Sequence, residues 1–461
     1  MEIIQTLASF IVALGVLVTA HEFGHFWVAK RLGVKILKFS VGFGKPLWRW
    51  QAGETEFVIA VVPLGGYVKM LDEREGEVAE EEAHRAFNRQ SLATRTAVVA
   101  AGPVANFVFA FFAYWVMLVM GVSGPRPIVG EVEDGSLASR AGLVQGSEIV
   151  EVEGLKTHTW DGVFRKSLGA ILDGRKVDIV IRTPGGSERL SDLDFTEISI
   201  DDISEGGFFT EIGITPLRPS IPPVIARVVP GEPAHQSGIE PGDRIIEANG
   251  SEIETWTEWV ELIRANPGQP LDLLVARSDE DVRITLTPAE VDVEGGVIGR
   301  IGAEVRIPDD LQTVPMGIER YGPGPAVFGA AARTWEMSVT TLKFLVKMVI
   351  GEASVHNISG PISIAHYAWQ SAKMGPARFL EFLALVSVSL AVLNLLPIPL
   401  LDGGHLLYYL IEFVTRKPVS EHLQAYGQQI GLVMLLSLMG LAVYNDILSI
   451  LLTLVTDISN N

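Results

Sequence analysis

The chain has 461 residues, enough for several domains, and a net charge of −19 from 36 basic and 55 acidic side chains. This negative charge argues against nucleic acid as a partner, because phosphates attract basic surfaces. Without cysteine the chain can form neither disulfides nor thiolate metal sites, so His, Asp and Glu remain as plausible metal ligands. Residues 121–320 hold 36 acidic and 18 basic side chains, so nearly all the excess charge lies there. A mean hydropathy of +0.31 beside 20% charged residues indicates membrane helices joined to a polar domain.

The first apolar run, Ile3 to Ala20, predicts a transmembrane helix. Its 18 residues carry no charge, and at about 1.5 Å per residue they span ~27 Å, close to the thickness of the hydrocarbon core. No basic region precedes the run and no small-residue cleavage site follows it, which favours a retained helix over a signal peptide. A basic cluster follows, consisting of Lys30, Arg31, Lys35, Lys38, Lys45 and Arg49. Such a cluster marks the cytoplasmic side, so we expect the N-terminus outside.

An H-E-x-x-H motif lies at the end of this run. His21 and His25 are four residues apart and share a helix face, so both can direct a ring nitrogen at one ion. Glu22 is not a ligand in this arrangement, but its carboxylate is placed to take a proton from a zinc-activated water. The alternative is a pair of helix histidines with ordinary hydrogen bonds. Ionisable residues in an apolar membrane segment are costly, which favours the functional interpretation.

Two stretches after the motif, Gly42-Phe43-Gly44 and Glu56 to Met70, predict β-strands. The second is broken by Pro63 and by a turn at Gly65-Gly66. A small cytoplasmic sheet and an exposed strand edge that pairs with an extended substrate are equally compatible with this pattern.

The second apolar run, Ala97 to Val122, predicts a helix that returns to the outside. Gly102-Pro103 and Asn106 interrupt it. Glycine and proline are tolerated in membrane helices and often lie at close helix contacts. We expect Asn106 to hydrogen-bond a neighbouring helix without a direct catalytic role.

The acidic block contains an internal repeat with a constant offset of 96 residues. The first copy contains Ala138, Gly142, Gly146, Ile149, Glu151, Gly154 and Trp160. The second copy contains Ala234, Gly238, Gly242, Ile245, Glu247, Gly250 and Trp256. Each copy alternates short β-rich runs with one helix, and the pair resembles a tandem of bacterial PDZ domains. Such domains bind peptide termini in a groove, so the copies are either peptide-binding modules or steric filters.

The remaining chain predicts one amphipathic helix and two more spans. Pro325 to Ile350 carries basic residues at helical spacing and fits an interfacial helix. The third span, Phe379 to Leu401, is broken by prolines near its end, and the fourth, Ile430 to Val455, is interrupted by Asn445 and Asp446. The first and third spans run in the same direction. His21, His25 and Asp402 should therefore lie at a similar depth near the cytoplasmic face.

Three features together resemble the site-2 protease family of intramembrane zinc metalloproteases: H-E-F-G-H in the first span, N-x-x-P-x-P-x-x-D-G in a late span, and the tandem repeat between them. The resemblance covers essentially the whole chain. It implies Zn²⁺ ligands at His21, His25 and Asp402, and Glu22 as general base. It also implies substrate-binding residues, which are Asn394, Pro397, Pro399, Gly65 and Gly66.

The same resemblance implies a substrate and a location. The substrate is a single-span anti-sigma factor already trimmed outside by another protease in the envelope stress response, or a remnant signal peptide. The location is the bacterial inner membrane, with the N-terminus and the repeats in the periplasm and the active site near the cytoplasmic face. A non-catalytic PDZ-bearing membrane scaffold is the main alternative. A zinc transporter fits less well, because the four spans show no internal membrane repeat.

Asp402 and His405 compete for the position of third ligand, and histidine is the commoner zinc ligand. Asp402 directly follows the proline-broken stretch, so its backbone can turn the carboxylate towards the first helix. An unpaired aspartate at that depth would be costly without a cation. The family pattern also places the ligand at the D of D-G. We therefore expect His405 to hydrogen-bond near the cytoplasmic boundary instead.

The predicted fold is a multi-domain membrane protein with a four-span α-helical protease core, a β region on the cytoplasmic side and two extracytoplasmic α+β PDZ domains. Residues 1–122 hold spans 1 and 2 with the β region. Residues 123–220 and 221–310 form the two repeats, and residues 311–375 form the amphipathic helix and a linker. Residues 376–461 hold spans 3 and 4 with the third ligand.

Overall fold

A computed structural model describes residues 2–196, 198, 201, 203, 207–217, 221–278, 280–293, 296–306 and 315–460. Within these ranges, four helices are long and apolar enough to cross a membrane. They are α1 (Glu2–Arg31), α2 (Leu92–Met120), α11 (Pro376–Leu395) and α13 (Glu421–Asn460). They match the four predicted apolar runs, so the expected membrane core with added sheet regions is confirmed. The domain boundaries expected at residues 220 and 310 lie outside the described residues.

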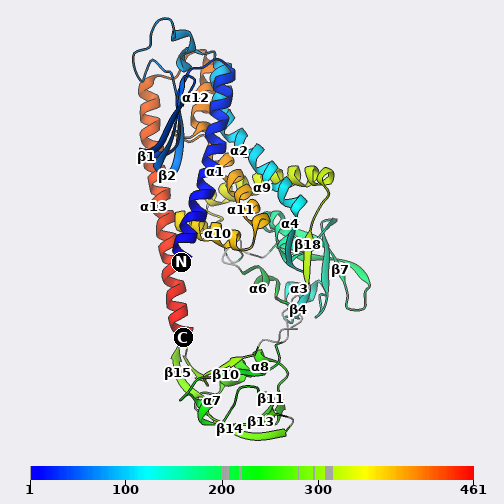
Figure 1. Cartoon of the computed structure of the whole chain (residues 1–461). Helices are drawn as coiled ribbons and strands as arrows, with labels where there is room; N and C mark the ends of the chain where they lie inside the picture. Colours follow the sequence, from blue (N-terminus) through cyan, green and yellow to red (C-terminus); the bar gives the residue numbers. More distant parts are fainter. Residues whose placement is uncertain are drawn as a thin grey trace.

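Helices α1, α2 and α11 pack side by side at the centre of the membrane part (Figure 1). The backbones of α1 and α2 nearly touch, because a β-carbon at Gly24 would lie only 2.2 Å from the carbonyl oxygen of Ala101. On its other side α2 packs against α11 through small and aliphatic side chains such as Ala110, Ala384 and Val388, all fully buried. Small residues let membrane helices approach closely, which explains this compact core.

Strands β1 (Ile36–Ala52) and β2 (Thr55–Met70) pair with each other and lie against α1. Ser40 on β1 is opposite both Val58 and Tyr67, so β2 bends around β1 between these two residues. The predicted break at Pro63 and Gly65-Gly66 corresponds to this bend, although the strand itself continues through it. Gly65 has a φ of +108°, which only glycine adopts readily. Among the described strands, no other strand pairs with the stretch that ends at Met70, so its outer edge is open.

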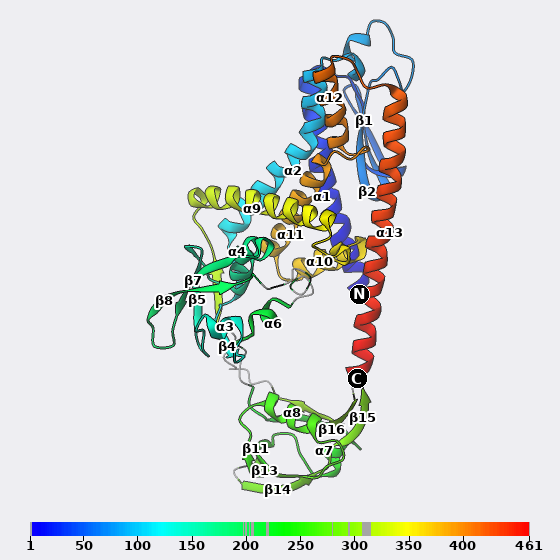
Figure 2. The same cartoon turned by 180° about the vertical axis from the view of Figure 1, so that it is seen from behind.

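The two copies of the 96-residue repeat fold alike at the side of the bundle that holds the start of α1 (Figure 2). Their four-stranded sheets have the equivalent orders β6-β5-β7-β8 and β12-β11-β13-β14, and two-stranded sheets β4-β9 and β10-β17 accompany them. The first copy consists of β4 (Val129–Val132), α3 (Leu137–Arg140), β5 (Glu148–Val152), β6 (Leu155–Lys156), α4 (Trp160–Asp173), β7 (Lys176–Arg182), β8 (Glu188–Asp194), α6 (Phe208–Ile212) and β9 (Ile214–Pro216).

The second copy has its own hydrophobic core and one additional two-stranded sheet, β15-β16. It consists of β10 (Ile225–Val228), α7 (Pro233–Gln236), β11 (Arg244–Ala248), β12 (Ser251–Glu252), α8 (Trp256–Ala265), β13 (Leu271–Arg277), β14 (Glu280–Leu286), β15 (Ala289–Val293), β16 (Gly296–Arg300) and β17 (Ala303–Val305). Strand β11 begins 96 residues after β5, and α8 begins 96 residues after α4. The sequence offset is therefore also a structural offset.

At one turn the first copy has Ser147 where the second copy has Asp243, yet both side chains accept a hydrogen bond from the amide three residues earlier. The carboxylate of Asp243 accepts a hydrogen bond from the Glu240 amide at 2.9 Å, and the Ser147 hydroxyl accepts one from the Val144 amide at 3.1 Å. The turn survives the substitution because both residues offer an oxygen at the same place. Only the second copy adds an ion pair there, between Asp243 and Arg277 at 2.7 Å.

Ion pairs join helix α4 of the first copy to the membrane part. Asp161 pairs with Arg378 of α11, and Asp173 lies 2.6 Å from Lys343 of α9 (Pro323–Ile350). Arg165 lies 3.1 Å from Glu319 on β18 (Met316–Glu319). Strand β18 pairs with β3 (Val122–Pro125), so the chain enters and leaves the repeats at neighbouring points. This pairing joins the C-terminal end of α2 to the N-terminal end of α9, and no strand of the two repeats takes part in it.

Glu319 sits between the two guanidinium groups of Arg165 and Arg333. Burial raises the pKa of the Glu319 carboxyl, but the attraction of Arg333 and Arg165 outweighs it and the pKa is lowered. The carboxylate therefore stays charged within the contact between the first repeat and α9. A helix is present at the predicted place as α9, which is not among the four candidate spans of the described chain. Its position at the membrane interface remains a prediction.

Two helices of the C-terminal part were missed by the sequence analysis: α10 (Pro361–Lys373) and α12 (Asp402–Thr415). The third span ends at Leu395 and not at Leu401, and the chain re-enters a helix at Asp402. Asp446 in α13 does not interrupt that helix. Its buried carboxylate accepts hydrogen bonds from the amides of Gly360, Ile362 and Ser363, so it caps α10 from another helix.

Candidate metal centre

Three side chains from α1 and α12 meet in the membrane core. The Nε2 atoms of His21 and His25 lie 3.2 Å apart, and the Oδ2 atom of Asp402 lies 3.2 Å from the first and 3.5 Å from the second. Within the described chain, this is the one group of three or more His, Asp and Glu side chains with ligand atoms close enough to share a metal ion. His405, three residues further along α12, is not part of it.

The spacing and chemistry of this group fit zinc. With metal–ligand bonds of about 2.0–2.2 Å and tetrahedral angles, neighbouring ligand atoms lie roughly 3.3–3.6 Å apart, close to the three distances above. Asp402 Oδ2 is buried, and its polar neighbours are the two histidine Nε2 atoms, with which it forms no regularly aligned hydrogen bond. A carboxylate oxygen in that state needs a cation or a proton, and two imidazoles with one carboxylate form a common catalytic zinc site.

The loop before α12 delivers Asp402 to the two histidines. Leu400 has a φ of +88°, a strained value for a residue with a side chain, and the helix resumes two residues later. Gly403 and Gly404 permit the tight path of this loop. A β-carbon at Gly403 would lie 2.1 Å from the Leu396 carbonyl oxygen, and one at Gly404 would lie 2.5 Å from that of Ile398. The glycine pair after Asp402 is thus a packing requirement of the loop.

Helix α2 packs against the rings of the two histidines. A β-carbon at Gly102 would lie 2.3 Å from Nε2 of His25 and 2.8 Å from Cε1 of His21, so both rings rest against the bare backbone there. One turn earlier, the carbonyl oxygen of Val98 lies 2.8 Å from Nδ1 of His25. That carbonyl can accept a hydrogen bond from Nδ1–H, which leaves Nε2 of His25 with a free electron pair.

Glu22 lies beside the group, next to the open edge of β2. A β-carbon at Gly66 would lie 3.1 Å from Cγ of Glu22. Gly65 packs instead against the ring of Phe43. The structure therefore brings one of the two expected substrate-binding glycines next to the expected general base.

Of the other expected substrate-binding residues, Asn394 lies in the last turn of α11, and Pro397 and Pro399 lie on the loop between α11 and α12. Pro397 is exposed, Asn394 is half-buried, and the carbonyl of Pro399 faces Gly431 of α13, where a β-carbon would lie only 2.1 Å away. Pro399 therefore takes part in packing this loop against α13. Pro397 is the more accessible of the two prolines.

The model of peptidase family M50 matches residues 9–438 of the chain. The chain belongs to this family. This M50 peptidase is 44% identical over 446 residues to the regulator of sigma-E protease RseP of Escherichia coli, a match that covers 95% of this chain and 98% of the relative. It is 38% identical over 448 residues to a putative zinc metalloprotease of Vibrio cholerae, covering 96% and 99%. It is 40% identical over 456 residues to a putative zinc metalloprotease of Neisseria meningitidis, covering 97% and 100%.

These relatives confirm the expected class of enzyme. This M50 peptidase is an intramembrane zinc metalloprotease of the site-2 type, and its cofactor is Zn²⁺. It is a multi-pass protein of the inner membrane. A non-catalytic scaffold is therefore the wrong description of the chain.

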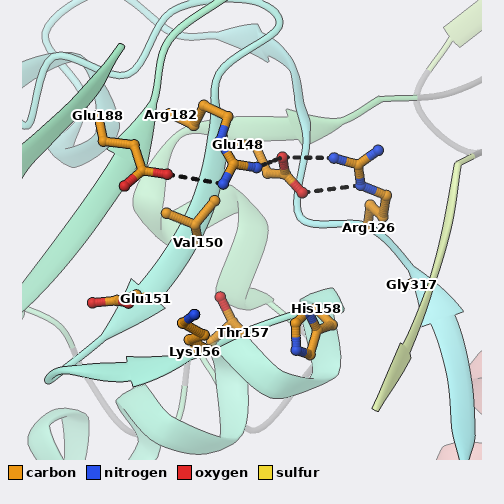
Figure 3. A pocket seen from close by; sticks show the side chains of 10 residues that line it. All are labelled: Arg126, Glu148, Val150, Glu151, Lys156, Thr157, His158, Arg182, Glu188 and Gly317. Atoms are coloured by element: carbon orange, nitrogen blue, oxygen red, sulfur yellow. Dashed lines mark hydrogen bonds and ion pairs between the residues drawn. The ribbon is translucent and has the colours of Figure 1, made fainter. Parts of the chain in front are cut away.

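A separate pocket of about 420 Å³ lies in the first repeat of this M50 peptidase (Figure 3). Its charged groups neutralise one another, because Glu148 pairs with both Arg126 and Arg182 at 2.7 and 2.9 Å, and Arg182 also pairs with Glu188 at 2.8 Å. None of its lining residues comes from α1, α2 or α12. This pocket and the metal centre are thus different places in the molecule.

Proposed function

We propose that His21, His25 and Asp402 hold the catalytic zinc ion and that Glu22 is the general base. The observation that carries this proposal is the convergence of three ligand atoms, 3.2–3.5 Å apart, from two helices whose sequence positions are far apart. A bound zinc ion supplies Lewis-acid activation of a water molecule and of the scissile carbonyl. Glu22 accepts the proton of that water and passes it to the leaving amine.

The open edge of β2 and the loop before α12 are proposed to hold the substrate in an extended form. A peptide bond inside a helix is shielded by its hydrogen bonds, so a membrane-spanning substrate must unwind before cleavage. Pairing with the β2 edge at Gly65 and Gly66 would replace backbone hydrogen bonds that lipid cannot supply. Asn394, Pro397 and Pro399 would hold the unwound segment from the other side. The contact between Gly66 and Glu22 supports this arrangement.

The substrate is proposed to be the membrane segment of a single-span protein already trimmed outside the membrane. An anti-sigma factor fits, because the E. coli relative is named a regulator of sigma-E protease. Remnant signal peptides are a second group with the same chemistry, a single apolar segment with a short exposed end. Cleavage of such segments would be regulated intramembrane proteolysis in a stress response.

The repeats are proposed to be PDZ domains on the periplasmic side, where they restrict access to the active site and bind peptide termini in their grooves. The first residues of α1 lie at the end of the bundle nearest the repeats, and its motif lies towards the other end (Figure 1). The basic cluster after α1 supports a cytoplasmic position for that other end. The active site would then lie near the cytoplasmic face, separated from the repeats by the length of the helices.

Metal analysis of the purified protein should give one zinc per chain. Removal of the metal with a chelator should abolish cleavage of a model transmembrane substrate, and added Zn²⁺ should restore it, because the water cannot be activated without the ion. His21→Ala should contain little zinc after the same purification. A His21→Ala protein that keeps one zinc per chain would contradict the ligand assignment.

Deletion of residues 127–305 should allow untrimmed, full-length substrates to be cleaved while a short substrate is cleaved as before. The expected reason is that the repeats restrict entry and lie far from the chemistry. Strands β3 and β18 remain in this variant and pair with each other, so the membrane part keeps its connection between α2 and α9.

Cleavage of both substrates by the deletion variant is measured beside its zinc content, which reports an intact site. The same deletion with Glu22→Gln is the control, and it should cleave neither substrate. If the deletion variant retains zinc but cleaves nothing, the repeats take part in catalysis and the access proposal is wrong.

A further inference from the structure

The proposed site demands a particular proton arrangement on each histidine. A neutral imidazole offers a metal its Nε2 electron pair only when the proton is on Nδ1, and a hydrogen-bond acceptor at Nδ1 fixes that form. For His25 the acceptor is the Val98 carbonyl, 2.8 Å away. For His21, the neighbour of Nδ1 is the side-chain amide of Asn106, whose Nδ2 lies 3.2 Å away.

Asn106 is completely buried, and its Oδ1 atom has no hydrogen-bond partner among the described residues. The amide group can turn by half a rotation, which exchanges Oδ1 and Nδ2 with little change in shape. With Oδ1 towards His21, the amide oxygen accepts a hydrogen bond from Nδ1–H and so gains a partner. With Nδ2 towards His21, the ring must carry its proton on Nε2, where it cannot bind a metal.

The position of Asn106 follows from the antiparallel packing of α1 and α2. Val98, Gly102 and Asn106 are four residues apart and share one face of α2. The Val98 carbonyl contacts Nδ1 of His25, and the Asn106 amide contacts Nδ1 of His21, four residues earlier in the motif. Gly102 lies between them and leaves room for both rings. The backbone of Asn106 is held by Ser387 of α11, whose hydroxyl donates to its carbonyl oxygen at 2.9 Å. One helix face thus matches the spacing of the motif on the other helix.

We propose that Asn106 is a positioning residue for the zinc site: its side-chain oxygen accepts a hydrogen bond from Nδ1–H of His21 and so directs the Nε2 electron pair towards the metal. This inference rests on the proposed role of His21 as a ligand. From the sequence alone, Asn106 was expected only to hydrogen-bond a neighbouring helix.

The test compares zinc dissociation constants of full-length variants, measured by competition with a chelator. Asn106→Leu removes the acceptor at similar volume and should weaken zinc binding about 10- to 100-fold, the usual cost of losing a partner of a ligating histidine. Asn106→Asp keeps an acceptor oxygen and should bind zinc within about threefold of the unmodified protein on the same reasoning. The absorption spectrum of the cobalt-substituted protein should change in Asn106→Leu and stay the same in Asn106→Asp.

Asn445→Leu is the matched control, because it makes the same substitution at another buried asparagine, whose amide donates to the carbonyls of Val355 and Ile358 and not to a residue of the metal group. It should leave the zinc affinity unchanged. If Asn106→Leu does not fold, Asn106→Ala takes its place with the same expected loss. Equal weakening by Leu and Asp, or an Asn106→Leu affinity within threefold of normal, overturns the proposal. His21→Ala distinguishes the proposed ligand role of His21 from the proposed positioning role of Asn106. If that variant loses zinc while Asn106→Leu keeps it, only the role of Asn106 is wrong.

Discussion

Replacing Glu22 by glutamine is expected to leave the zinc content unchanged and to lower the cleavage rate by about 10²- to 10⁴-fold, the usual contribution of a positioned acid–base group. Glu22 is not part of the group formed by the two histidines and Asp402, so the metal loses no ligand. Glutamine has nearly the same shape as glutamate but cannot accept a proton from water. Metal analysis beside a cleavage assay on the same preparation measures both quantities.

A second glutamate substitution shows whether the effect belongs to Glu22. Glu412 on α12 forms an ion pair with Arg95 at 2.6 Å and lies outside the metal group. Glu412→Gln should therefore change the cleavage rate far less than Glu22→Gln. Loss of zinc together with activity in Glu22→Gln would make Glu22 a ligand or a structural support, and the assignment of a general base would be wrong.

Asp402→Asn is expected to weaken zinc binding by more than the ~10- to 100-fold caused by loss of a ligand's outer partner, and to abolish cleavage. The neutral amide is a poorer ligand than the carboxylate, and it provides no charge to balance the metal in a low-dielectric site. His405→Ala should keep most of the zinc and most of the activity, because its ring packs near Tyr408 and not in the metal group.

The comparison of these two variants is decisive because both residues lie in the first turn of α12, three residues apart. Zinc content and the cleavage rate are measured for each. If His405→Ala loses the metal and Asp402→Asn keeps it, then His405 is the third ligand and the assignment of Asp402 is wrong.

Sequence reasoning located the metal group because its signals are local or topological. The i, i+4 spacing of His21 and His25 fixes a shared helix face, and the direction of the spans places Asp402 at the same depth. Neither argument depends on how two helices are rotated against each other. The structure brings these three residues together as expected, and the role of each in metal binding and catalysis remains a prediction.

The residues that sequence reasoning missed all act across a helix contact. Nothing in a single sequence shows which face of α2 meets α1, so Gly102 could be recognised only as a small residue in a span. Asp446 appeared to interrupt the fourth span, although it caps α10 from a distance of 83 to 86 residues along the chain. Helix α12 was missed because the prolines before it suggest an ending, and only the structure shows that the helix resumes at Asp402.

The close contact between α1 and α2 requires glycine at positions that the sequence motifs of this protein leave unspecified. The string H-E-x-x-H permits any residue at its third and fourth positions, but a β-carbon at Gly24 would collide with the backbone of Ala101. A chain with alanine at position 102 would keep every letter of both motifs and still push His25 from its place. Genome surveys that count motif letters would score such a chain as an active protease. Inspection of these two glycines offers a simple way to recognise inactive members, and it needs no knowledge of their substrates.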